Sequence, residues 1–359
     1  MTLHHPAPAP ATGPATTVPA GTAPADMAQG EARTPRRVLR ILLWHVHGSW
    51  TTAFVHSGHT CLLPVTPDRG PDGRGRARTW DWPRNAVETP WERIRGSEPD
   101  LVVLQRPHEL ALAERLLGRT LGRDVPAVYV EHNTPRDDVP VTRHPVADRD
   151  DIPVVHVTHF NDLFWDCGRA PTRVVEHGVP DPGHRYTGEI ARAGVVLNEP
   201  LRRWRFTGTD LLPALADRVP LDLFGMGVAG VPDHFGLPPS RLRAHEDLPQ
   251  GAMHDELARR RAYAHPLRWT SLGLSLIEAM MLGLPVAVLG TTEAHEAVPP
   301  EAGTVSTDPR VLAEALHAFQ EDRDLAFRTG MAARTAALRR YGLTRFLDNW
   351  DRVLQEVTS

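Results

Sequence analysis

The sequence predicts an α/β protein made of two doubly wound lobes, each with a parallel sheet covered by helices. Three observations lead to this fold class. The chain has 359 residues, which is more than one average core needs. Short apolar, β-branched segments alternate with segments of helical spacing, as in βαβ units. This series stops near residue 185, and a second series of the same kind starts near residue 190.

A tail precedes the first lobe. Residues 1–35 are rich in Ala, Pro, Thr and Gly and show no hydrophobic period. Such a segment buries too little apolar surface to offset the entropy of ordering it, so we predict that it is disordered. It also lacks the continuous apolar region of a secretory signal, and we therefore expect a cytoplasmic protein.

The first lobe is predicted over residues 36–185. Its first strand is expected in VLRILLWHV, which ends at Gly48 and Ser49, and its second in HTCLLPV. The span 68–78 is rich in Gly, Asp and Arg and predicts a surface loop. Four more apolar segments that break into polar residues predict further strands: LVVLQ, VPAVYVEHN, IPVVHVTHF and TRVVEHGV. A helix is predicted in HELALAERLLGRTLG, between the first two of these.

The second lobe is predicted over residues 190–340, after a linker in PDPGHRYTGEIARAG. Strands are expected in GVVLN, LDLFG and PVAVLG, and helices in TDLLPALADR, HDELARRRAYAHP, SLIEAMMLG and RVLAEALHAFQ. Residues 341–359 predict an amphipathic helix. Its apolar face would carry Phe346, Trp350, Val353, Leu354 and Val357.

Composition narrows the classes of partner. The formal net charge of -4 gives no general case for binding nucleic acid or an anionic membrane. The longest apolar region, 272–289, is interrupted by Ser275, Glu278, Gly283 and Pro285, so it does not read as a membrane span. No basic amphipathic helix is evident. We expect no nucleic-acid partner and at most peripheral contact with a membrane.

Several kinds of catalytic site are excluded or disfavoured. All 40 basic residues are arginine, which rules out a P-loop lysine, a Schiff-base lysine and a lysine base. Any phosphate contact from a basic side chain must come from arginine. Cys61 and Cys167 provide neither a disulfide framework nor a metal set, and no histidine–carboxylate group has metal spacing. HVHGSW lacks the dinucleotide fingerprint, and GLSLI lacks the closing glycine of a nucleophile elbow. We predict no metal and no cofactor.

The strongest functional pattern lies in RWTSLGLSLIEAMMLGLPVAV. Gly273 lets the backbone come close to a ligand, and a helix is predicted to begin just after it. The free N–H groups and positive dipole end of that helix would bind a diphosphate. Ser275 is expected to add a hydroxyl donor or to cap the helix. Glu278 lies about one turn in, among apolar neighbours, where the alternative is a solvated helix charge.

This segment resembles the donor signature of GT-B-fold retaining glycosyltransferases of the family-four (group 1) type. That signature runs Glu-Gly-Phe-Gly-Leu, three residues, Glu-Ala-Met and then Gly-x-Pro-Val. Here it corresponds to residues 270–274, 278–280 and 283–286, and weaker similarities extend over most of residues 37–359. The resemblance implies two Rossmann-like lobes that face each other across a cleft. It also implies that the donor nucleotide lies mainly on the second lobe.

The resemblance implies that Glu278 accepts hydrogen bonds from the donor ribose. It further implies donor contacts for Thr270, Ser271, Gly273, Leu274 and Ser275. Thr270 replaces the family's first glutamate, whose carboxylate lies beside the transferred sugar. A threonine can hydrogen-bond a sugar hydroxyl but carries no negative charge. An altered choice of sugar or an inactive relative therefore stays open.

Relatives usually carry an arginine and a lysine on the first loop of the second lobe, bound to the donor phosphates. Here Thr207 stands at the lysine position, and Arg202, Arg203 and Arg205 are the available cations. We expect Arg205 first and Arg203 next to stabilise the leaving diphosphate, with a solvated basic loop as the alternative.

On the first lobe, His132 follows a predicted strand at the cleft-facing edge. The resemblance implies that it contacts the sugar, and the alternative is a structural histidine at a strand end. Gly48, after the first strand, could bring backbone N–H groups towards the donor.

We therefore predict a hexosyltransferase-like enzyme that moves a sugar from a nucleotide diphosphate sugar, with retention and without a metal. Its candidate catalytic residues are His132, Arg205 and Glu278. The acceptor, a lipid, polysaccharide, metabolite or protein, is not defined. Two alternatives stay open: a non-hydrolysing nucleotide-sugar epimerase, and a non-catalytic nucleotide-sugar-binding subunit, which Thr270 suggests.

Overall fold

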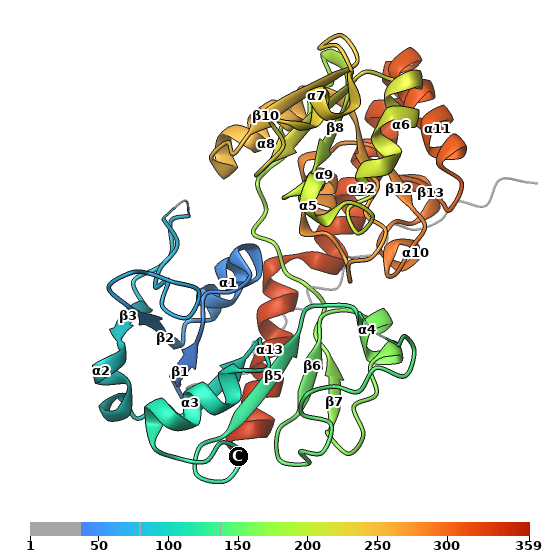
Figure 1. Cartoon of the computed structure of the whole chain (residues 1–359). Coiled ribbons are helices and arrows are strands. Elements are labelled where there is room, and N and C mark those ends of the chain that lie inside the picture. Colours follow the sequence, from blue (N-terminus) through green and yellow to red (C-terminus); the bar gives the residue numbers. More distant parts are fainter. Residues whose placement is uncertain (1–36, 79, 137) are drawn as a thin grey trace, which may run out of the picture. The chain divides into compact units, whose positions relative to one another are not determined.

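The computed structural model describes residues 37–78, 80–136 and 138–359, and it contains two parallel sheets (Figure 1). The predicted tail, 1–35, lies outside the described residues. Apolar segments form most of the inner strands, which are almost wholly buried because helices cover both faces of a doubly wound sheet, whereas the edge strands are partly exposed. The predicted fold class, two doubly wound parallel-sheet lobes, is confirmed.

The first sheet has seven strands in the order β3-β2-β1-β4-β5-β6-β7, and all its strand pairs are parallel. The strands are β1 (Arg40–Leu43), β2 (Thr60–Val65), β3 (Ala86–Pro90), β4 (Leu101–Leu104), β5 (Ala127–Glu131), β6 (Val154–His156) and β7 (Thr172–Val174). Its helices are α1 (Gly48–Phe54), α2 (Trp91–Ile94), α3 (Glu109–Leu117) and α4 (His159–Phe164).

The second sheet has six strands in the order β10-β9-β8-β11-β12-β13, again all parallel. The strands are β8 (Ile190–Val196), β9 (Leu221–Gly225), β10 (Leu242–Glu246), β11 (Arg260–His265), β12 (Val286–Leu289) and β13 (Gly303–Ser306). Its helices are α5 (Pro200–Arg203), α6 (Leu212–Arg218), α7 (Val231–Phe235), α8 (Gln250–Ala258), α9 (Leu274–Leu282), α10 (Ala294–Ala297), α11 (Pro309–Glu321) and α12 (Arg323–Tyr341).

The strand order reverses once in each sheet, between β1 and β4 in the first and between β8 and β11 in the second. At such a switch point the flanking connections leave in opposite directions. Ligands of open α/β sheets bind in the crevice that this opens at the carboxyl ends of the strands. The two edges to inspect for a site are therefore the residues after β1 and β4, and those after β8 and β11.

Strand β11 corrects one sequence prediction. HDELARRRAYAHP was predicted to be one helix, but the helix ends at Ala258 and a central strand begins at Arg260. Two adjacent arginines rarely start a buried strand, which is why the pattern misled. Both are buried here because their guanidinium groups find acceptors, Arg260 on Asp222 and Arg261 on the carbonyl of Gly188.

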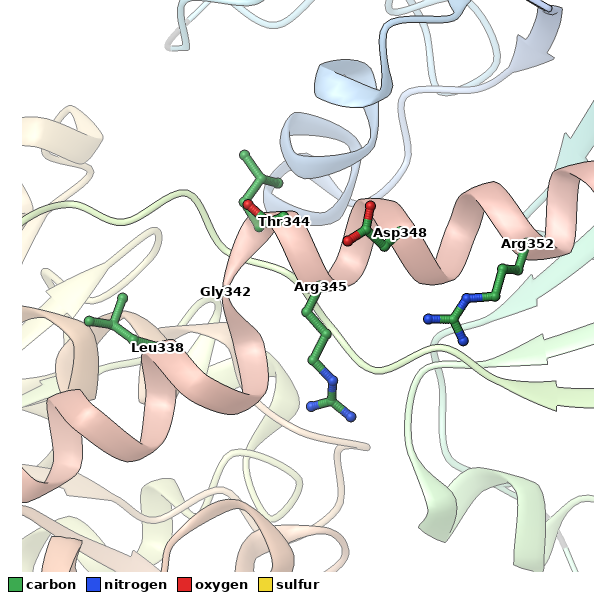
Figure 2. Close-up of a pocket in the computed structure, with 7 residues that line it drawn as sticks. Leu338, Gly342, Thr344, Arg345, Asp348 and Arg352 are labelled. Atoms are coloured by element: carbon green, nitrogen blue, oxygen red, sulfur yellow. The ribbon is translucent and has the colours of Figure 1, made fainter. Parts of the chain in front are cut away.

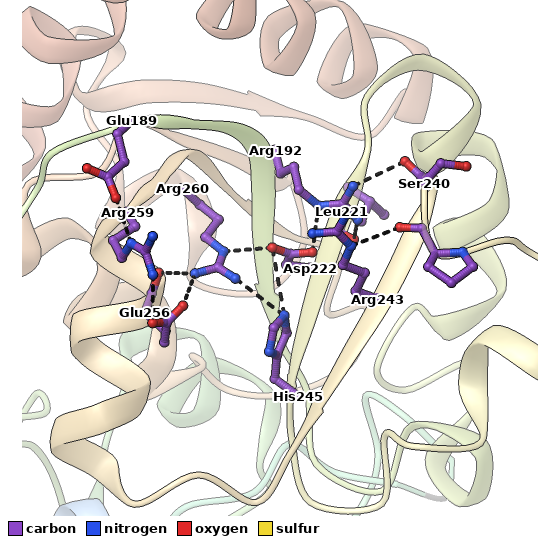
Figure 3. A network of polar contacts seen from close by, with 11 residues as sticks. Glu189, Arg192, Leu221, Asp222, Ser240, Arg243, His245, Glu256, Arg259 and Arg260 are labelled. Carbon is purple, nitrogen blue, oxygen red and sulfur yellow. Dashed lines mark hydrogen bonds and ion pairs between the residues drawn. The ribbon is translucent and has the colours of Figure 1, made fainter.

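A buried ionic network surrounds β11 (Figure 3). Asp222 on β9 is fully buried, and its carboxylate accepts from Arg192 Nε at 2.6 Å and from Arg260 Nε at 2.7 Å. Burial alone would raise the pKa of Asp222. The hydrogen bond from His245 and the charges of Arg260 and Arg192 outweigh burial and lower the pKa to about 2. The network therefore joins β8, β9, β10 and β11 through charges that stay ionised.

Other differences from the sequence predictions are smaller. No strand was predicted at β3, β10 or β13 and no helix at α12. Strand β8 begins at Ile190, inside the segment expected to be the linker. The buried face of α12 consists mostly of small residues, Ala326, Gly330, Ala333 and Ala337, so its hydrophobic period is weak. A Cβ at Gly330 would collide with the carbonyl oxygen of Gly283. The small residues therefore let α12 pack closely on the turn after α9.

The last helix, α13 (Leu343–Thr358), completes the core of the first lobe (Figure 1). Trp350 and Phe346 are buried against Trp50 and Phe54 of α1, with the Trp50 and Trp350 ring centroids 5.6 Å apart. The predicted apolar face of this helix is confirmed. Within the described residues, no helix combines the length and the apolar character needed to cross a bilayer.

Candidate functional site

The carboxyl edge of the second sheet brings its first two loops together. Asn198 follows β8, and its Oδ1 accepts a hydrogen bond from the backbone N–H of Met226 at 3.1 Å. Gly225, the last residue of β9, has a φ of 133°, and a Cβ there would collide with the carbonyl of Leu197. Only glycine allows this close approach, so the glycine fixes the two loops side by side at the carboxyl edge of the sheet.

The helix predicted after Gly273 is confirmed. Helix α9 starts at Leu274, and Gly273 is its N-cap, in extended conformation and without a side-chain cap. A Cβ at Gly273 would lie 2.5 Å from Cε1 of His265, the last residue of β11. Gly273 thus lets the start of α9 approach the switch point. The N–H of Leu276 donates to the carbonyl of Gly273, so within the described residues the N–H groups of Leu274 and Ser275 are those left to meet an anion.

Ser275 was expected to cap α9 or to add a hydroxyl donor, and it does not cap the helix. It lies within the helix, and its Oγ accepts a hydrogen bond from the Tyr263 hydroxyl at 3.0 Å. The same hydroxyl lies 3.2 Å from Nδ1 of His265. Burial lowers the pKa of His265 to about 3, so this imidazole is neutral near pH 7. The hydroxyl of Ser275 therefore connects α9 to β11.

Glu278 lies one turn into α9 and is only 6% exposed, which rules out the alternative of a solvated helix charge. Its Oε2 accepts a hydrogen bond from Gln250 Nε2 at 2.9 Å and lies 3.3 Å from His254 Nε2. Both partners are on α8, four residues apart and on one face of that helix. Sequence reasoning missed Gln250 and His254 because it assigned no role to α8, although their spacing was readable.

The three arginines of the first loop differ in their environments. Arg205, expected to be the leading phosphate ligand, has a side chain that is 67% exposed and forms an ion pair with Asp210 at 2.8 Å. Arg202 forms an ion pair with Glu199. Arg203 is partly buried, and burial together with the charges of Arg136 and Arg202 lowers its pKa. The structure favours Arg203 over Arg205 for a ligand contact.

On the first sheet, His132 lies just beyond β5 and is buried. Its Nε2 is 3.1 Å from Oε1 of Gln105, which follows β4. Gln105 donates from Nε2 to the carbonyl of Trp44 at 2.8 Å, which fixes the orientation of its amide. Because Oε1 can only accept, the proton of His132 is on Nε2, and Nδ1 keeps a lone pair.

Neutral rings surround His132. The ring centroid of His47 lies 4.0 Å away, that of Trp50 5.2 Å and that of His177 6.5 Å. Burial lowers the pKa of His47 to about 4 and that of His177 to about 3, and it holds the pKa of His132 well below the usual range. The carboxyl edge of the first sheet is thus polar but uncharged at this point.

Gly48 has a packing role. It is the first residue of α1, and a Cβ there would collide with the ring of Trp80. Packing against Trp80 is therefore enough to require glycine at this position, and we assign no donor contact to Gly48. Among the residues that the structure describes, no group of three or more His, Cys, Asp or Glu side chains is arranged to hold a metal ion.

Two hydrogen bonds join the segment before α9 to the segment after β5. Ser271 Oγ donates to the carbonyl of His132 at 2.7 Å, and Trp269 Nε1 donates to the carbonyl of Pro135 at 2.8 Å. Thr270 lies between these two residues and is partly buried. The structure therefore brings Ser271 and His132 together, with Thr270 next to Ser271 in the chain.

A separate pocket of about 440 Å³ lies where α12 meets α13 (Figure 2). None of the predicted site residues lines it. Its lining includes Arg345, which forms an ion pair with Glu176 at 3.0 Å, and Arg340 on α12 is bonded to the same carboxylate at 2.6 Å. These two arginines thus join the end of α12 and the start of α13 to the segment after β7.

Comparison with known proteins identifies the architecture. No protein-family model and no curated protein matches the chain. Solved structures do, and they include a sucrose-phosphate synthase from Thermosynechococcus elongatus, with a TM-score of 0.67 and 14% identity over 89% of this chain and 98% of that one. Anabaena HepE in complex with UDP has a TM-score of 0.66 and 15% identity over 89% and 100%. The chain has the GT-B fold.

A glycosyltransferase from Rickettsia africae also matches, with a TM-score of 0.62 and 13% identity over 90% of this chain and 99% of that one. The agreement spans the full length of these proteins, so both lobes belong to the shared architecture. At such identities the likeness establishes the fold, and the chemistry has to be argued from the residues of this chain.

Proposed function

We propose that this protein is a glycosyltransferase that moves a sugar from a nucleotide diphosphate sugar to an acceptor. One observation carries the proposal. The uncapped start of α9 lies at the switch point of the second sheet, and the buried carboxylate of Glu278 follows one turn later. The first feature suits a diphosphate and the second suits a ribose diol. HepE, which has the same fold, has been solved in complex with UDP and with UDP-glucose.

The contacts of Glu278 define its proposed role. Gln250 and His254 both approach Oε2, so we assign Oε1 to the ribose hydroxyls. A carboxylate that is held by two neighbours accepts a diol with little further loss of side-chain freedom. Glu278 is in this proposal a binding residue that orients the donor.

The proposed reaction retains the configuration of the transferred sugar and uses no metal. The acceptor hydroxyl attacks on the face from which the nucleotide departs, and the leaving phosphate takes the acceptor proton. Arg203 and the N–H groups of α9 stabilise the charge that develops on the diphosphate. His132, with its proton fixed on Nε2, offers Nδ1 to a sugar hydroxyl. We place this reaction in the cytoplasm.

Thr270 supports one competing proposal, a nucleotide-sugar-binding subunit without turnover. It replaces the carboxylate that relatives carry beside the transferred sugar, and it cannot supply a negative charge there. The side chains on either side of it, Trp269 and Ser271, nevertheless donate hydrogen bonds to the first lobe. We favour the enzyme because a negative charge beside the sugar only assists the transfer. The attacking group is the acceptor hydroxyl and the leaving group is the nucleoside diphosphate, and Thr270 replaces neither.

The test begins with binding. We expect one of UDP, GDP, ADP or dTDP to raise the melting temperature, and the corresponding nucleotide sugars to be consumed when candidate acceptors are added. Glu278→Gln should weaken binding of the nucleoside diphosphate about thirtyfold, because it removes a charge-assisted hydrogen bond of about 2 kcal/mol.

Glu321→Gln is the matched control, since Glu321 is an exposed glutamate of the same lobe. Absence of binding by all four nucleotides would refute the proposal. Binding without consumption of any nucleotide sugar would support the non-catalytic subunit. Conversion of a nucleotide sugar without an acceptor would support an epimerase.

A further inference from the structure

Arg136, on the segment that follows β5, has a guanidinium group that the reaction proposed above does not use. Its Cζ lies 5.9 Å from the ring centroid of Phe206, in a cation–π contact between the first lobe and the first loop of the second lobe. The next residue back, Pro135, accepts the hydrogen bond from Trp269. Arg136 is therefore held beside the second lobe by the contact of its own side chain and by the hydrogen bond to the backbone of the residue before it.

The loop that Arg136 touches carries Arg203. The backbone N–H of Phe206 donates to the carbonyl of Arg203 at 2.9 Å, so both residues belong to one turn. The carbonyl of Phe206 accepts from the N–H groups of Arg268 at 2.9 Å and Trp269 at 3.2 Å, in the segment that leads to α9. Three segments thus converge here: 132–136, 203–206 and 268–274.

The backbone of this loop is strained. Glu199 and Trp204, which flank α5, have φ values of 53° and 38°, and neither is glycine. Residues with side chains rarely adopt such values, and they persist where the surrounding structure enforces them, often at ligand sites. Trp204 directly follows Arg203, so the strained backbone lies next to the residue that carries this guanidinium group.

The charges in this region are unevenly matched. Arg205 and Arg268 both pair with Asp210, and Arg202 pairs with Glu199. Among the described residues, no carboxylate forms an ion pair with Arg136 or Arg203, and each lies in the electrostatic field of the other. Two guanidinium groups held together repel, and an anion with oxygens for both would turn this repulsion into attraction.

The geometry points to a two-sided anion site in which Arg136 of the first lobe and Arg203 of the second bind the donor diphosphate together. This inference rests on the proposed function and names the residue that supplies the second positive charge. In a chain without lysine that charge comes from the opposite lobe. Binding of the diphosphate then holds the segments 132–136 and 203–206 together, so the donor itself stabilises the contact between the lobes.

The experiment compares two ligands that differ by one phosphate. Calorimetry measures the dissociation constants of the nucleoside diphosphate that binds best among UDP, GDP, ADP and dTDP, and of its monophosphate. We expect the preference of the wild-type protein for the diphosphate to fall about tenfold in Arg136→Gln and in Arg203→Gln. Arg136→Lys should recover part of it, because the charge returns without the fork.

Arg143→Gln is the control, since Arg143 is an exposed arginine of the same lobe that pairs with Asp148 and Asp166. It should keep the wild-type preference. If Arg136→Gln weakens the two ligands equally, Arg136 acts through the cation–π contact alone and the inference is wrong. If Arg136→Gln keeps the full preference while Arg203→Gln loses it, the inference is also wrong and the proposed function stands. If the wild-type protein binds none of the four nucleotides, both fall.

Discussion

The two lobes share one strand order around their switch points but differ in a buried polar cluster that each contains. In the first lobe a cluster of neutral imidazoles lies near the carboxyl edge, with His132 between His47 and Trp50. In the second lobe Asp222 is buried as an ion between two arginines. The same topology therefore holds neutral imidazoles at the carboxyl edge of the first sheet and an ionised network near the amino ends of the strands of the second, where Asp222 is the second residue of β9 and Arg260 the first of β11.

The comparison predicts different responses to acid, and this is the largest effect that we expect. Among the described residues, burial lowers the pKa of one histidine in the second lobe, His265, and of five in the first. Those five are His45, His47, His132, His156 and His177. Below pH 6.5 the unfolded chain binds protons that these folded imidazoles do not. The free energy of unfolding therefore decreases as the pH is lowered below 6.5, by about 1.4 kcal/mol per pH unit for each histidine that stays neutral in the folded protein.

Asp222 behaves differently because its pKa is lowered to about 2. Its contribution is complete above the pKa of an unfolded aspartate, near 4, and is lost only between about pH 4 and pH 2. Seven of the nine tryptophans lie in the first lobe, counting Trp350 on α13, so fluorescence reports mainly on that lobe and circular dichroism on both. Urea midpoints from pH 7.5 to 5 should fall more steeply by fluorescence. Equal slopes would contradict the comparison.

Trp350→Ala tests the aromatic core of the first lobe. The ring is fully buried against Trp50, Phe54 and Phe346, and its removal leaves a large cavity. We expect a loss of about 4 kcal/mol in the free energy of unfolding. Hydrogen exchange should show the loss in β1 and β4. Gln355→Ala, an exposed change on the same helix, should have little effect.

Asp222→Asn tests the ionic core of the second lobe. It leaves Arg192 and Arg260 buried with no opposite charge at the centre of the network, and we expect a loss of about 3 kcal/mol. Hydrogen exchange should show the loss in β8, β9 and β11. Asp217→Asn is the control, because Asp217 pairs with Arg241 at the surface, where an ion pair contributes about 0–1 kcal/mol. Equal effects of the two changes would show that Asp222 is not a central contact.

Arg205→Gln should have the smallest effect. Its ion pair with Asp210 is exposed, and Arg268 holds the same carboxylate at 2.9 Å, so stability should change by less than about 0.5 kcal/mol. Binding of a nucleoside diphosphate should weaken less than threefold, against about tenfold for Arg203→Gln. A larger effect on binding than that of Arg203→Gln would restore Arg205 as the main phosphate ligand.

Much of the fold was predictable because many of the inner strands, and helix α9, consist mainly of apolar residues that are bounded by polar residues or glycine. The turn at Gly273, the helix after it and the strand at Val286 followed from residue types in order. Strand β11 did not follow, since Arg260 and Arg261 look exposed until their acceptors on other segments are known. Helix α12 escaped because Ala and Gly pack closely without a strong hydrophobic period.

The candidate site was predictable only in part. Glu278 and Ser271 lie on the patterned segment, and sequence order placed both correctly at the start of α9 or just before it. The choice between Arg203 and Arg205 depends on Asp210, which neutralises one of them, and on Arg136, which comes from another lobe. Contacts between distant segments decide such questions, and no local spacing encodes them.

Helix α13 has a consequence for how the protein is made. The core around Trp50 is closed by Trp350 and Phe346, which the ribosome adds only after the entire second lobe. During translation the first lobe therefore waits with an apolar surface exposed while its neighbour is synthesised. The first lobe to emerge is the last to be finished.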